Sequence, residues 1–360
     1  MYARYSLVLM VTHACNMRCS YCYTGAKLPR SMPEAVGRKA VDRALASVEQ
    51  GGTLDLGFFG GEPLLEADRV SSLIAYARQR AEAVGVEVIP GLTTNGTVAG
   101  GLAWALMILP ELSLAISFDG LPRIHDRHRR FPDGSGSSRV VLDTMRRLRE
   151  AGKEFRVAMV VRPDTAALLP EGIAFLHDSG VRHVEPSLDV WAAWSASDIA
   201  RLEAAIDASA DVWRDGLPDL SVSWFDEKAA LLAGVPVDET PRCGFGDGEM
   251  AVAPSGRLYP CERLIGEDDE ANPMRLAGHV LDGEDFLGRA SPPGRCAEGC
   301  RQCLIQAMCN TTCRCCNYVR TGQCGQPDRL LCALNRACAR ETARVLEELG
   351  AVPMPGGAAR

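Results

Sequence analysis

The chain has 360 residues, of which 47% are hydrophobic and 24% are charged, and its formal net charge is -7. These values exclude a wholly disordered chain and predict two domains, or one large domain with a smaller one. The mild acidity argues against nucleic acid as a partner, and the longest apolar run, Leu102 to Leu109, is too short to span a membrane. The N-terminus lacks a signal-peptide pattern, so we expect a cytoplasmic protein with no membrane partner.

Six short apolar segments alternate with helical patterns in the first part of the chain. The expected strands are Tyr5–Val11, Leu54–Phe59, Val86–Leu92, Leu112–Phe118, Phe155–Val161 and Val181–Leu188. The expected helices run from Ser31-Met32-Pro33-Glu34 to about Gln50, onward from Glu62-Pro63, over Arg139–Ala151 and over Ile199–Trp213, with Gly51-Gly52 ending the first. Strands that alternate with helices predict an α/β fold with a parallel sheet or a partial barrel.

Polar motifs follow four of these strands. They are His13–Cys22, Gly60–Pro63, Thr93–Thr97 and Ser117–Gly120. Ligands of parallel α/β folds bind at the carboxyl ends of the strands, so we expect the four motifs to share one face. We expect a barrel domain over residues 1–215 and a cysteine-rich domain over 241–345. A bridging region, 216–240, would join them, and a frayed tail, 346–360, would follow.

The 15 cysteines are grouped in two parts of the chain. Cys15, Cys19 and Cys22 lie near the N-terminus, and the other twelve lie between Cys243 and Cys338. Disulfides are rare in a reducing cytosol, whereas clustered thiolates bind zinc, copper(I) or iron–sulfur clusters. The distribution predicts one metal site near the N-terminus and a separate C-terminal domain with several metal centres.

The first cysteine group has the spacing CxxxCxxC, in the segment Cys15-Asn16-Met17-Arg18-Cys19-Ser20-Tyr21-Cys22. Three thiolates this close in sequence can hold three irons of a four-iron cluster and leave the fourth iron open for chemistry. The alternatives are a zinc site that lacks one ligand, or three cysteines with no shared role.

This motif, at the end of the first strand and with an aromatic residue before the third cysteine, resembles that of the radical S-adenosylmethionine (SAM) superfamily. Later stretches resemble further motifs of the superfamily in the same order. They are GGEP at Gly60-Gly61-Glu62-Pro63, TNGT at Thr94-Asn95-Gly96-Thr97, and the S-x-DG…HD-x-x-R pattern of its sulfatase-maturase and peptide-maturase branch at Ser117–Gly120 and His125–Arg129. The resemblance implies a partial (β/α)6 TIM-like barrel.

The resemblance also implies which residues bind SAM. Tyr21 would touch the adenine and Leu188 would line its pocket. The GGEP residues Gly60, Gly61 and Glu62 would lie at the methionine amino group, with Asn95 of the TNGT stretch in the same cofactor-binding set. Gly61, Ser117 and Arg129 would hold the methionine or ribose part, and a permanently charged guanidinium suits a carboxylate partner. The other charges of the basic loop, Arg123 to Arg130, are expected to form a solvated surface.

The C-terminal cysteines resemble in full the seven-cysteine SPASM pattern, which holds two auxiliary four-iron clusters. Twelve residues separate Cys243 from Gly256, four residues separate Gly256 from Cys261, and CxxCxxxxxCxxxC begins at Cys300. By this resemblance, Cys243, Cys261 and Cys313 bind auxiliary cluster I, while Cys300, Cys303, Cys309 and Cys332 bind auxiliary cluster II. The alternative is a pair of zinc sites.

The chain departs from the sulfatase-maturing branch at two positions. Glu249 stands where that branch has a further cysteine, so the fourth iron of auxiliary cluster I is open, capped by another group, or bound by a cysteine outside the pattern. Those cysteines are Cys296, Cys315, Cys316, Cys324 and Cys338, and the rest of them are expected to be packed thiols. Glu262 stands where that branch has a basic aspartate and is a candidate catalytic base; the alternative is a surface or cluster-side carboxylate.

The resemblance implies an enzyme that cleaves SAM to methionine and a 5′-deoxyadenosyl radical, which removes a hydrogen atom from an unactivated carbon. We expect a maturase that oxidises or cross-links a ribosomally made peptide or protein, with a flavodoxin or ferredoxin as reductant. Because the chain starts only a few residues before its first strand, we expect a separate leader-peptide recognition protein, or the mouth of the sheet, to recruit the substrate. The alternatives are an anaerobic sulfatase maturase that forms formylglycine, a small-molecule dehydrogenase, and a non-catalytic zinc-binding scaffold.

Overall fold

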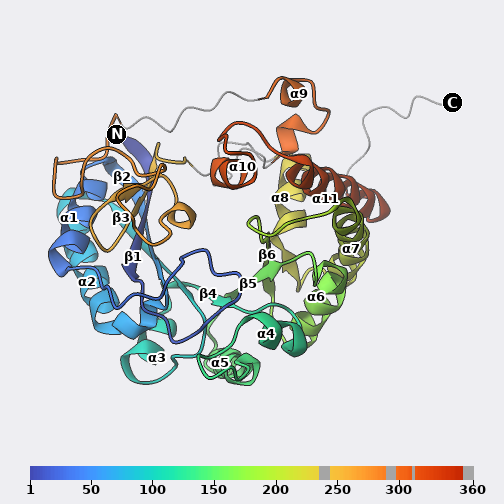
Figure 1. Ribbon diagram of the computed structural model, residues 1–360, viewed down its shortest axis with the longest axis horizontal. Helices are drawn as coiled ribbons and strands as arrows, with labels where there is room; N and C mark the ends of the chain where they lie inside the picture. Colours follow the sequence, from blue (N-terminus) through green and yellow to red (C-terminus); the bar gives the residue numbers. More distant parts are fainter. Residues whose placement is uncertain (235–243, 289–296, 310–312, 352–360) are drawn as a thin grey trace. The chain divides into compact units, whose positions relative to one another are not determined.

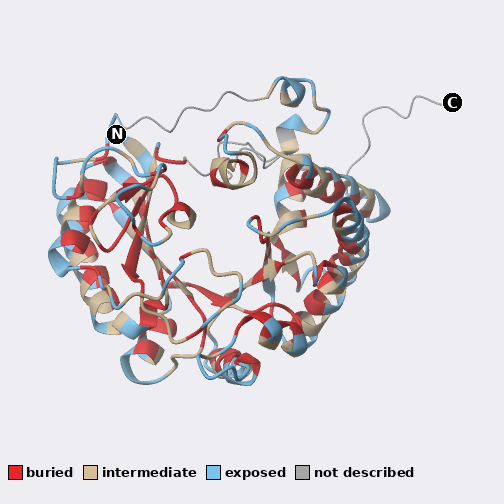
Figure 2. Cartoon of the chain, viewed as in Figure 1, coloured by how far each residue is buried: buried red, intermediate tan, exposed pale blue. Residues whose placement is uncertain are grey.

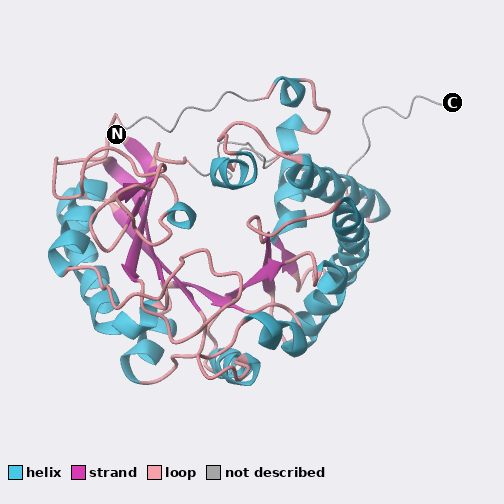
Figure 3. Ribbon diagram, in the orientation of Figure 1, coloured by secondary structure: helices cyan, strands magenta, loops and turns pink. Residues whose placement is uncertain are grey.

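The computed structural model describes residues 1–234, 244–288, 297–309 and 313–351. The chain divides into two compact units, each built from segments that are distant in sequence. The first unit comprises residues 1–118, 125–155 and 244–293, and the second comprises residues 119–124, 156–243 and 294–360, as far as these are described. Both units combine strands with helices (Figure 3).

A mostly parallel sheet forms the first unit, in the order β4-β3-β2-β1-β8-β9. The strands are β1 (Tyr2–Thr12), β2 (Val48–Gly60), β3 (Glu87–Thr94), β4 (Ser113–Ser117), β8 (Glu249–Val252) and β9 (Leu258–Tyr259). The β8–β9 pair is antiparallel. Its helices are α1 (Glu34–Leu45), α2 (Ala67–Val84), α3 (Gly101–Met107) and α5 (Ser138–Glu150), with short 3-10 turns η1 (Pro63–Glu66) and η4 (Glu262–Leu264). Helix α4 (Pro122–His128) begins in the second unit and ends in the first.

The core of the first unit lies between the sheet and helices α1 and α2 (Figures 1 and 2). Alternate residues of β1 are buried and face buried partners on β2, with Leu7 opposite Leu56 and Leu9 opposite Phe58. Helix α1 buries residues three and four apart along one face, including Val36 and Ala40. A stripe at that spacing is what a helix needs to cover a sheet.

The second unit has three parallel strands and most of the long helices. Its strands are β5 (Arg156–Val161), β6 (His183–Leu188) and β7 (Ser221–Val222), and its helices are α6 (Leu169–Asp178), α7 (Ala196–Gly216), α8 (Ser223–Leu232), α9 (Glu298–Arg301), α10 (Arg314–Thr321) and α11 (Arg329–Glu348), with 3-10 turns η2 (Ala166–Leu168) and η5 (Gln306–Met308). Helix α11 packs against α7 and α8. Ser195 and Asp198 form a capping box that fixes the start of α7.

The six expected strands are confirmed, with ends that differ by a few residues, and so is the α/β class with a parallel sheet consistent with a partial TIM barrel. The prediction that the first helix runs to about Gln50 is wrong, because α1 ends at Leu45 and β2 begins at Val48. Gly51 and Gly52 lie inside β2, where a Cβ on Gly52 would come within 2.6 Å of the Ala3 carbonyl oxygen. The glycines therefore admit a close strand pairing rather than end a helix.

The segment predicted as a basic loop, Arg123 to Arg130, is mostly helix α4. Residues 216–234, from the predicted bridging region, hold β7 and α8, and β7 pairs with β6. The predicted domain boundaries remain a prediction. Of the predicted tail, 346–360, residues 346–348 form the end of α11, and residues 352–360 lie outside the described residues. Of the helices that the structure describes, none is both long and apolar enough to cross a membrane.

Candidate functional site

The CxxxCxxC loop leaves the carboxyl end of β1 and runs over the first unit. Cys15, Cys19 and Cys22 are all partly buried, and the side chain of Met17 between them is completely buried. The Met17 backbone N–H donates to the Cys15 sulfur at 3.4 Å. A buried apolar anchor inside the loop holds the three thiols at the sheet edge without burying them fully.

Lys27 lies directly against the third cysteine of the loop. Its ammonium nitrogen is 2.7 Å from the Cys22 sulfur, and the Thr24 hydroxyl is 3.2 Å from the same sulfur. Burial by itself raises the pKa of the Cys22 thiol, but the Lys27 charge and these hydrogen bonds outweigh it and lower the pKa below its ordinary value. This cysteine is therefore prepared to act as a thiolate, the form that ligates metals.

The GGEP segment is tied to the end of β1 by its backbone. A Cβ on Gly60 would lie 2.4 Å from the Thr12 carbonyl oxygen, and one on Gly61 would lie 2.2 Å from the Ala14 carbonyl oxygen. The Gly61 N–H donates to Thr12 at 2.8 Å. Only glycine fits this close approach, so these residues are required by the fold of the loop itself, whatever they contact in a ligand.

Glu62 joins the GGEP segment to the TNGT segment. Its carboxylate is fully buried and accepts from the Thr94 hydroxyl at 2.7 Å, from the Asn95 N–H at 2.7 Å and from the Leu64 N–H at 3.0 Å. Burial raises the pKa of Glu62, and these hydrogen bonds offset part of that increase. The Glu62 side chain, which is predicted to contact SAM, therefore also connects the GGEP segment to the TNGT segment through hydrogen bonds.

Asn95 reaches from the TNGT segment to the cysteine loop. Its amide nitrogen lies 2.9 Å from the Asn16 side-chain oxygen and 3.9 Å from the Cys15 sulfur. Asn16 in turn donates to the Thr97 hydroxyl at 2.8 Å. An amide beside a cysteine sulfur is the kind of outer contact that orients a metal ligand.

Arg129 and Tyr21 lie together on the other side of the loop. The Arg129 guanidinium carbon is 5.2 Å from the centre of the Tyr21 ring, and the His128 ring centre is 5.8 Å from that of Tyr21. The loop is fastened to this segment because the Ser20 hydroxyl lies 2.8 Å from His128 Nδ1 and the Ser20 N–H donates to the His128 carbonyl at 2.9 Å. Two residues predicted to bind SAM are therefore held side by side.

The HD residues of the HD-x-x-R pattern shape the backbone around Arg129. The His125 ring stacks on Phe118 at 4.4 Å, and its Nε2 lies 2.9 Å from the Ser137 hydroxyl, which donates to the Arg129 carbonyl at 2.8 Å. The Asp126 carboxylate accepts from the Ser138 N–H at 2.7 Å, which satisfies a free donor at the start of α5. These residues position the arginine through the main chain.

The candidate base Glu262 lies beside Cys261, the cysteine that precedes it. The Cys261 sulfur is 3.5 Å from the Glu262 carboxylate, and Cys261 is buried. Burial first and the Glu262 charge second hold the pKa of Tyr23 well above its ordinary value, which brings Tyr23 into the same group. Tyr23 also stacks on Phe59 at 6.1 Å, so the residue after Cys22 and the residue before GGEP meet here.

Ser117 and Leu188 lie at the ends of their strands, as the sequence predicts. Ser117 is the last residue of β4 in the first unit and is partly buried, while Leu188 is the last residue of β6 in the second unit and is buried. Asp119, from the second unit, is buried and accepts from the Val160 N–H at 3.1 Å, so it holds the start of its segment against β5.

The auxiliary-cluster cysteines of the second unit are also partly buried. They are Cys300, Cys303, Cys309, Cys313 and Cys332. Burial raises the pKa of the Cys332 thiol, and the charges of Cys309 and Cys303 raise it further. Cys243 and Cys296 lie outside the described residues.

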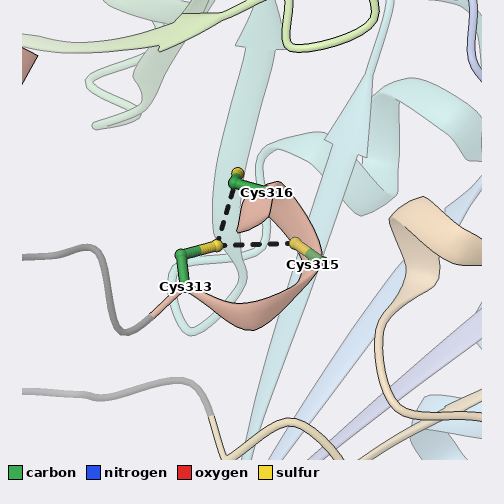
Figure 4. Close-up of side chains that lie close together, drawn as sticks. All are labelled: Cys313, Cys315 and Cys316. Carbon is green, nitrogen blue, oxygen red and sulfur yellow. Dashed lines mark hydrogen bonds between the residues drawn. The ribbon is translucent and has the colours of Figure 1, made fainter. Parts of the chain in front are cut away.

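Cys313, Cys315 and Cys316 form a second sulfur group at the start of α10 (Figure 4). The Cys313 sulfur lies 3.4 Å from each of the other two, and all three lie within 4.8 Å of one another. Hydrogen bonds with Cys313 and Cys315, together with burial, raise the pKa of the Cys316 thiol strongly.

Three contacts around the site were not predicted from the sequence: Lys27 with Cys22, Ser20 with His128, and Tyr23 with Glu262. Lys27 lies five residues after Cys22, and no spacing rule predicts that a lysine at this position contacts a metal-ligating cysteine. The others depend on segments that are remote in sequence. The one signal available in the sequence was His128, within the run His125-Asp126-Arg127-His128-Arg129.

Comparison with known proteins gives the family. Residues 9–176 match the model of the radical SAM superfamily. These residues form a radical SAM domain. Its recognition from the sequence is thereby confirmed, and the chain is a radical SAM enzyme. A radical SAM domain binds SAM and a [4Fe-4S] cluster, and three partly buried thiols on one loop suit three irons of such a cluster.

Similar proteins cover most of the chain. A cysteine-type anaerobic sulfatase-maturating enzyme of Clostridium novyi is 25% identical over 278 residues, which are 72% of this chain and 73% of that protein. A PqqA peptide cyclase of Gluconobacter oxydans is 24% identical over 362 residues, 92% of this chain and 90% of that protein. The match to an uncharacterized protein of Methanocaldococcus jannaschii is shorter, at 49% of this chain and 60% of that protein.

The radical SAM fold is also found in solved structures. One described as "Native anSMEcpe with bound AdoMet and Kp18Cys peptide" has a TM-score of 0.78 at 18% identity, and covers 96% of this chain and 99% of that chain. At this identity the likeness shows the fold, and the structural neighbours are SPASM-type radical SAM enzymes.

Proposed function

We propose that this radical SAM enzyme oxidises or cross-links a ribosomally made peptide or protein. One observation carries the proposal furthest: a single unit gathers the CxxxCxxC loop, the GGEP segment, Asn95 and Arg129 around the carboxyl ends of its parallel strands. The similarity to a peptide cyclase over nine-tenths of both chains supports the choice of a peptide as substrate.

Three [4Fe-4S] clusters are part of this proposal. Cys15, Cys19 and Cys22 would bind the SAM cluster. Cys300, Cys303, Cys309 and Cys332 would bind auxiliary cluster II, and Cys243, Cys261 and Cys313 would bind auxiliary cluster I. The partly buried thiols of Cys300, Cys303, Cys309 and Cys332 suit metal ligation and support the second set.

The residues of the first unit have distinct roles in this reaction. When bound, SAM and its cluster supply a 5′-deoxyadenosyl radical that removes a hydrogen atom from a substrate carbon. Arg129, fixed over Tyr21, would bind the carboxylate of the methionine part. Glu62 would hold the GGEP segment in place through its hydrogen bond from the Asn95 N–H. Lys27 would stabilise the thiolate form of Cys22.

Glu262 is proposed as the group that accepts a proton from the oxidised substrate. It lies beside Cys261 and Tyr23, at the start of η4. A flavodoxin or ferredoxin would deliver electrons, and a separate leader-peptide recognition protein would bring the substrate.

Two measurements test the proposal. Anaerobically reconstituted, reduced enzyme given SAM should form 5′-deoxyadenosine and methionine, and a Cys15→Ala/Cys19→Ala/Cys22→Ala variant should not. Short peptides encoded beside the gene, co-expressed with the enzyme, should lose two hydrogens and gain an internal cross-link detectable by tandem mass spectrometry. A parent enzyme that forms no 5′-deoxyadenosine contradicts the proposal at its first step.

Formylglycine formation is the second candidate, favoured by the similarity to the Clostridium novyi enzyme. Glu249 and Glu262 stand where the sulfatase-maturing pattern has cysteine and aspartate, and they count against it. The same co-expression experiment separates the two, because an aldehyde in place of a serine or cysteine side chain replaces the cross-link.

A further inference from the structure

Helix α8 of the second unit carries a buried lysine, Lys228, to which the sequence assigned no role. Lys228 is only 2% exposed, and its ammonium nitrogen donates to the Asn335 side-chain oxygen at 3.0 Å and to the Met308 carbonyl. Both acceptors are neutral, and Lys228 forms no ion pair with a carboxylate within the described residues. A buried charge is costly unless an opposite charge compensates it.

The side chains that act on the charge of Lys228 do not compensate it. Burial lowers the pKa of Lys228, and the charges of Cys338, Glu227 and Cys309 offset part of this effect. Burial raises the pKa of the Cys338 thiol to about 12, so Cys338 is uncharged at neutral pH. Glu227 is exposed, so water screens its charge. Of the three, only Cys309 is an assigned metal ligand.

Lys228 connects the two segments that carry the cysteines assigned to auxiliary cluster II. The Met308 carbonyl that accepts from Lys228 belongs to the peptide bond between Met308 and Cys309. Asn335 lies three residues after Cys332 on α11, and residues three apart in a helix lie on the same side of it. The ammonium group therefore fastens the segment of Cys309 to the side of α11 that carries Cys332.

The other two assigned ligands, Cys300 and Cys303, lie on the same short segment as Cys309. The Cys303 N–H donates to the Cys300 carbonyl at 3.3 Å. Gln306 continues the turns, because its N–H donates to the Cys303 carbonyl at 3.0 Å and its carbonyl accepts from the Cys309 N–H at 3.2 Å. All four assigned cysteines are described, belong to the second unit and are partly buried, which suits the binding of one cluster.

We infer that Lys228 is the positioning residue of auxiliary cluster II and supplies the positive charge that compensates this cluster. The inference rests on the proposed function for the existence of the cluster. A [4Fe-4S] cluster with thiolate ligands is anionic, and reduction makes it more so. A buried ammonium behind the Met308–Cys309 peptide bond therefore favours assembly of the cluster and raises its reduction potential.

The test isolates one cluster in the full-length protein. A Cys15→Ala/Cys19→Ala/Cys22→Ala/Cys261→Ala background removes assigned ligands of the other two clusters, so that about four irons and four sulfides per chain should remain after anaerobic reconstitution. In this background, Lys228→Met keeps a long unbranched side chain and removes its charge. At a fixed ambient potential, the electron paramagnetic resonance signal of the reduced cluster should fall about tenfold, whereas Lys228→Arg should retain most of it.

Two further variants separate the charge from the packing. Asn335→Asp keeps an oxygen that accepts from Lys228 and adds a negative charge, so it should keep the iron and lower the signal as Lys228→Met does. Lys153→Met is the matched control. Lys153 is also partly buried and donates to main-chain carbonyls, those of Leu109 at 2.6 Å and Leu112 at 2.7 Å, but these lie in the first unit. It should leave the signal unchanged.

An unchanged signal in a Lys228→Met protein that holds its full iron overturns the inference. If Lys228→Met fails to hold iron, Asn335→Asp decides, since a lower signal supports the inference and an unchanged signal overturns it. Loss of iron in Lys228→Met, Lys228→Arg and Asn335→Asp alike overturns it too, because packing rather than charge would then govern the cluster. A signal that falls equally in Lys153→Met has the same consequence.

The proposed function fails by different measurements. A background protein without iron and sulfide contradicts the proposed auxiliary cluster II, and the role of Lys228 with it. SAM cleavage is assayed in proteins with an intact CxxxCxxC loop, where the parent and Lys228→Met proteins should both form 5′-deoxyadenosine. A parent that cannot cleave SAM contradicts the proposed function, whereas a parent that cleaves SAM together with an unchanged cluster signal in Lys228→Met contradicts the role of Lys228 alone.

Discussion

Glu62 gives a residue-level test of how the SAM-binding loops are held. Its buried carboxylate accepts three hydrogen bonds, so Glu62→Ala leaves the Thr94 hydroxyl and the Asn95 N–H without their acceptor. We expect a loss of about 3 kcal/mol in the free energy of unfolding. Glu62→Gln keeps one oxygen acceptor and should lose less than half as much.

The measurement is the urea midpoint of anaerobic protein followed by circular dichroism. Glu82→Ala is the matched control, because Glu82 is exposed at the end of α2 and should change stability by less than about 0.5 kcal/mol. A Glu62→Ala protein as stable as this control would mean that the loops are held by other contacts.

Lys27 gives a test of how the chain tunes the cluster. Its ammonium lies 2.7 Å from the Cys22 sulfur and adds positive charge beside a proposed cluster ligand. Lys27→Met should make the cluster harder to reduce and slow 5′-deoxyadenosine formation about tenfold, because a positive neighbour favours the extra electron.

Lys27→Arg keeps the charge and should retain most of the rate. The reduction potential of the cluster, followed by electron paramagnetic resonance, should fall in Lys27→Met and stay near the parent value in Lys27→Arg. An unchanged potential in both variants would show that Lys27 has a purely structural role.

At the scale of elements, the decisive contact is the crossing of the GGEP segment over the end of β1. Gly61→Ala would place a Cβ 2.2 Å from the Ala14 carbonyl oxygen, and both partners of this clash are backbone. The two segments must separate, which removes the hydrogen bond from the Gly61 N–H to Thr12. We expect a loss of more than about 2 kcal/mol in stability and a large fall in bound SAM.

Gly100→Ala is the control for this substitution. A Cβ at Gly100 meets no atom within 4 Å, and the residue has an extended backbone, so stability and SAM binding should match the parent. Equilibrium dialysis with labelled SAM measures binding, and thermal melting measures stability. A Gly61→Ala protein that binds SAM like the control would rule out the crossing as a constraint on the site.

The elements that the sequence predicts best are those with a local pattern. The strands from Tyr5 to Leu188 are short apolar runs bounded by turn residues, and all six form. The strands β8 and β9 were not predicted, because β8 has four residues and β9 has two, and β8 pairs with β1 across more than 200 residues of sequence. The end of α1 was predicted too late in the chain because Gly51 and Gly52 were interpreted as a helix end. Glycine permits an irregularity in a strand as readily as it ends a helix.

The residues of the candidate site also fall into those that the sequence could predict and those that it could not. Motif residues such as Arg129 and Asn95 could be named in advance, since a family pattern fixes their order in the chain. Their supports could not, because the contact of Lys27 with Cys22, or of Ser20 with His128, depends on how loops close in space. The sequence also left five cysteines without a role, and only the sulfur positions at Cys313 separate Cys315 and Cys316 from the rest.

At the scale of the whole molecule, the two ends of the chain are stabilised by different means. Strands β1 to β4 have a large apolar core, with Leu7, Leu56 and Leu114 almost fully buried. The cysteine-bearing segment 297–309 contrasts with them. Its helix α9 has four residues with none buried, and Leu304 is 101% exposed. We expect a segment with so little core to depend on the proposed metal ligation for its structure.

Removal of iron should therefore loosen the molecule unevenly. In hydrogen-exchange mass spectrometry, anaerobic treatment with an iron chelator should speed exchange in 297–309 by about tenfold or more and leave β1 to β4 within about twofold of the untreated protein. A Cys300→Ala/Cys303→Ala protein, reconstituted without chelator, should show the same local increase, while Cys324→Ala should not. Uniform acceleration would mean that the clusters hold the whole fold, and no acceleration would mean that peptide contacts alone order this segment. These outcomes differ because of where the apolar core lies. A metal cluster should contribute most to the stability of a segment that has few buried apolar side chains.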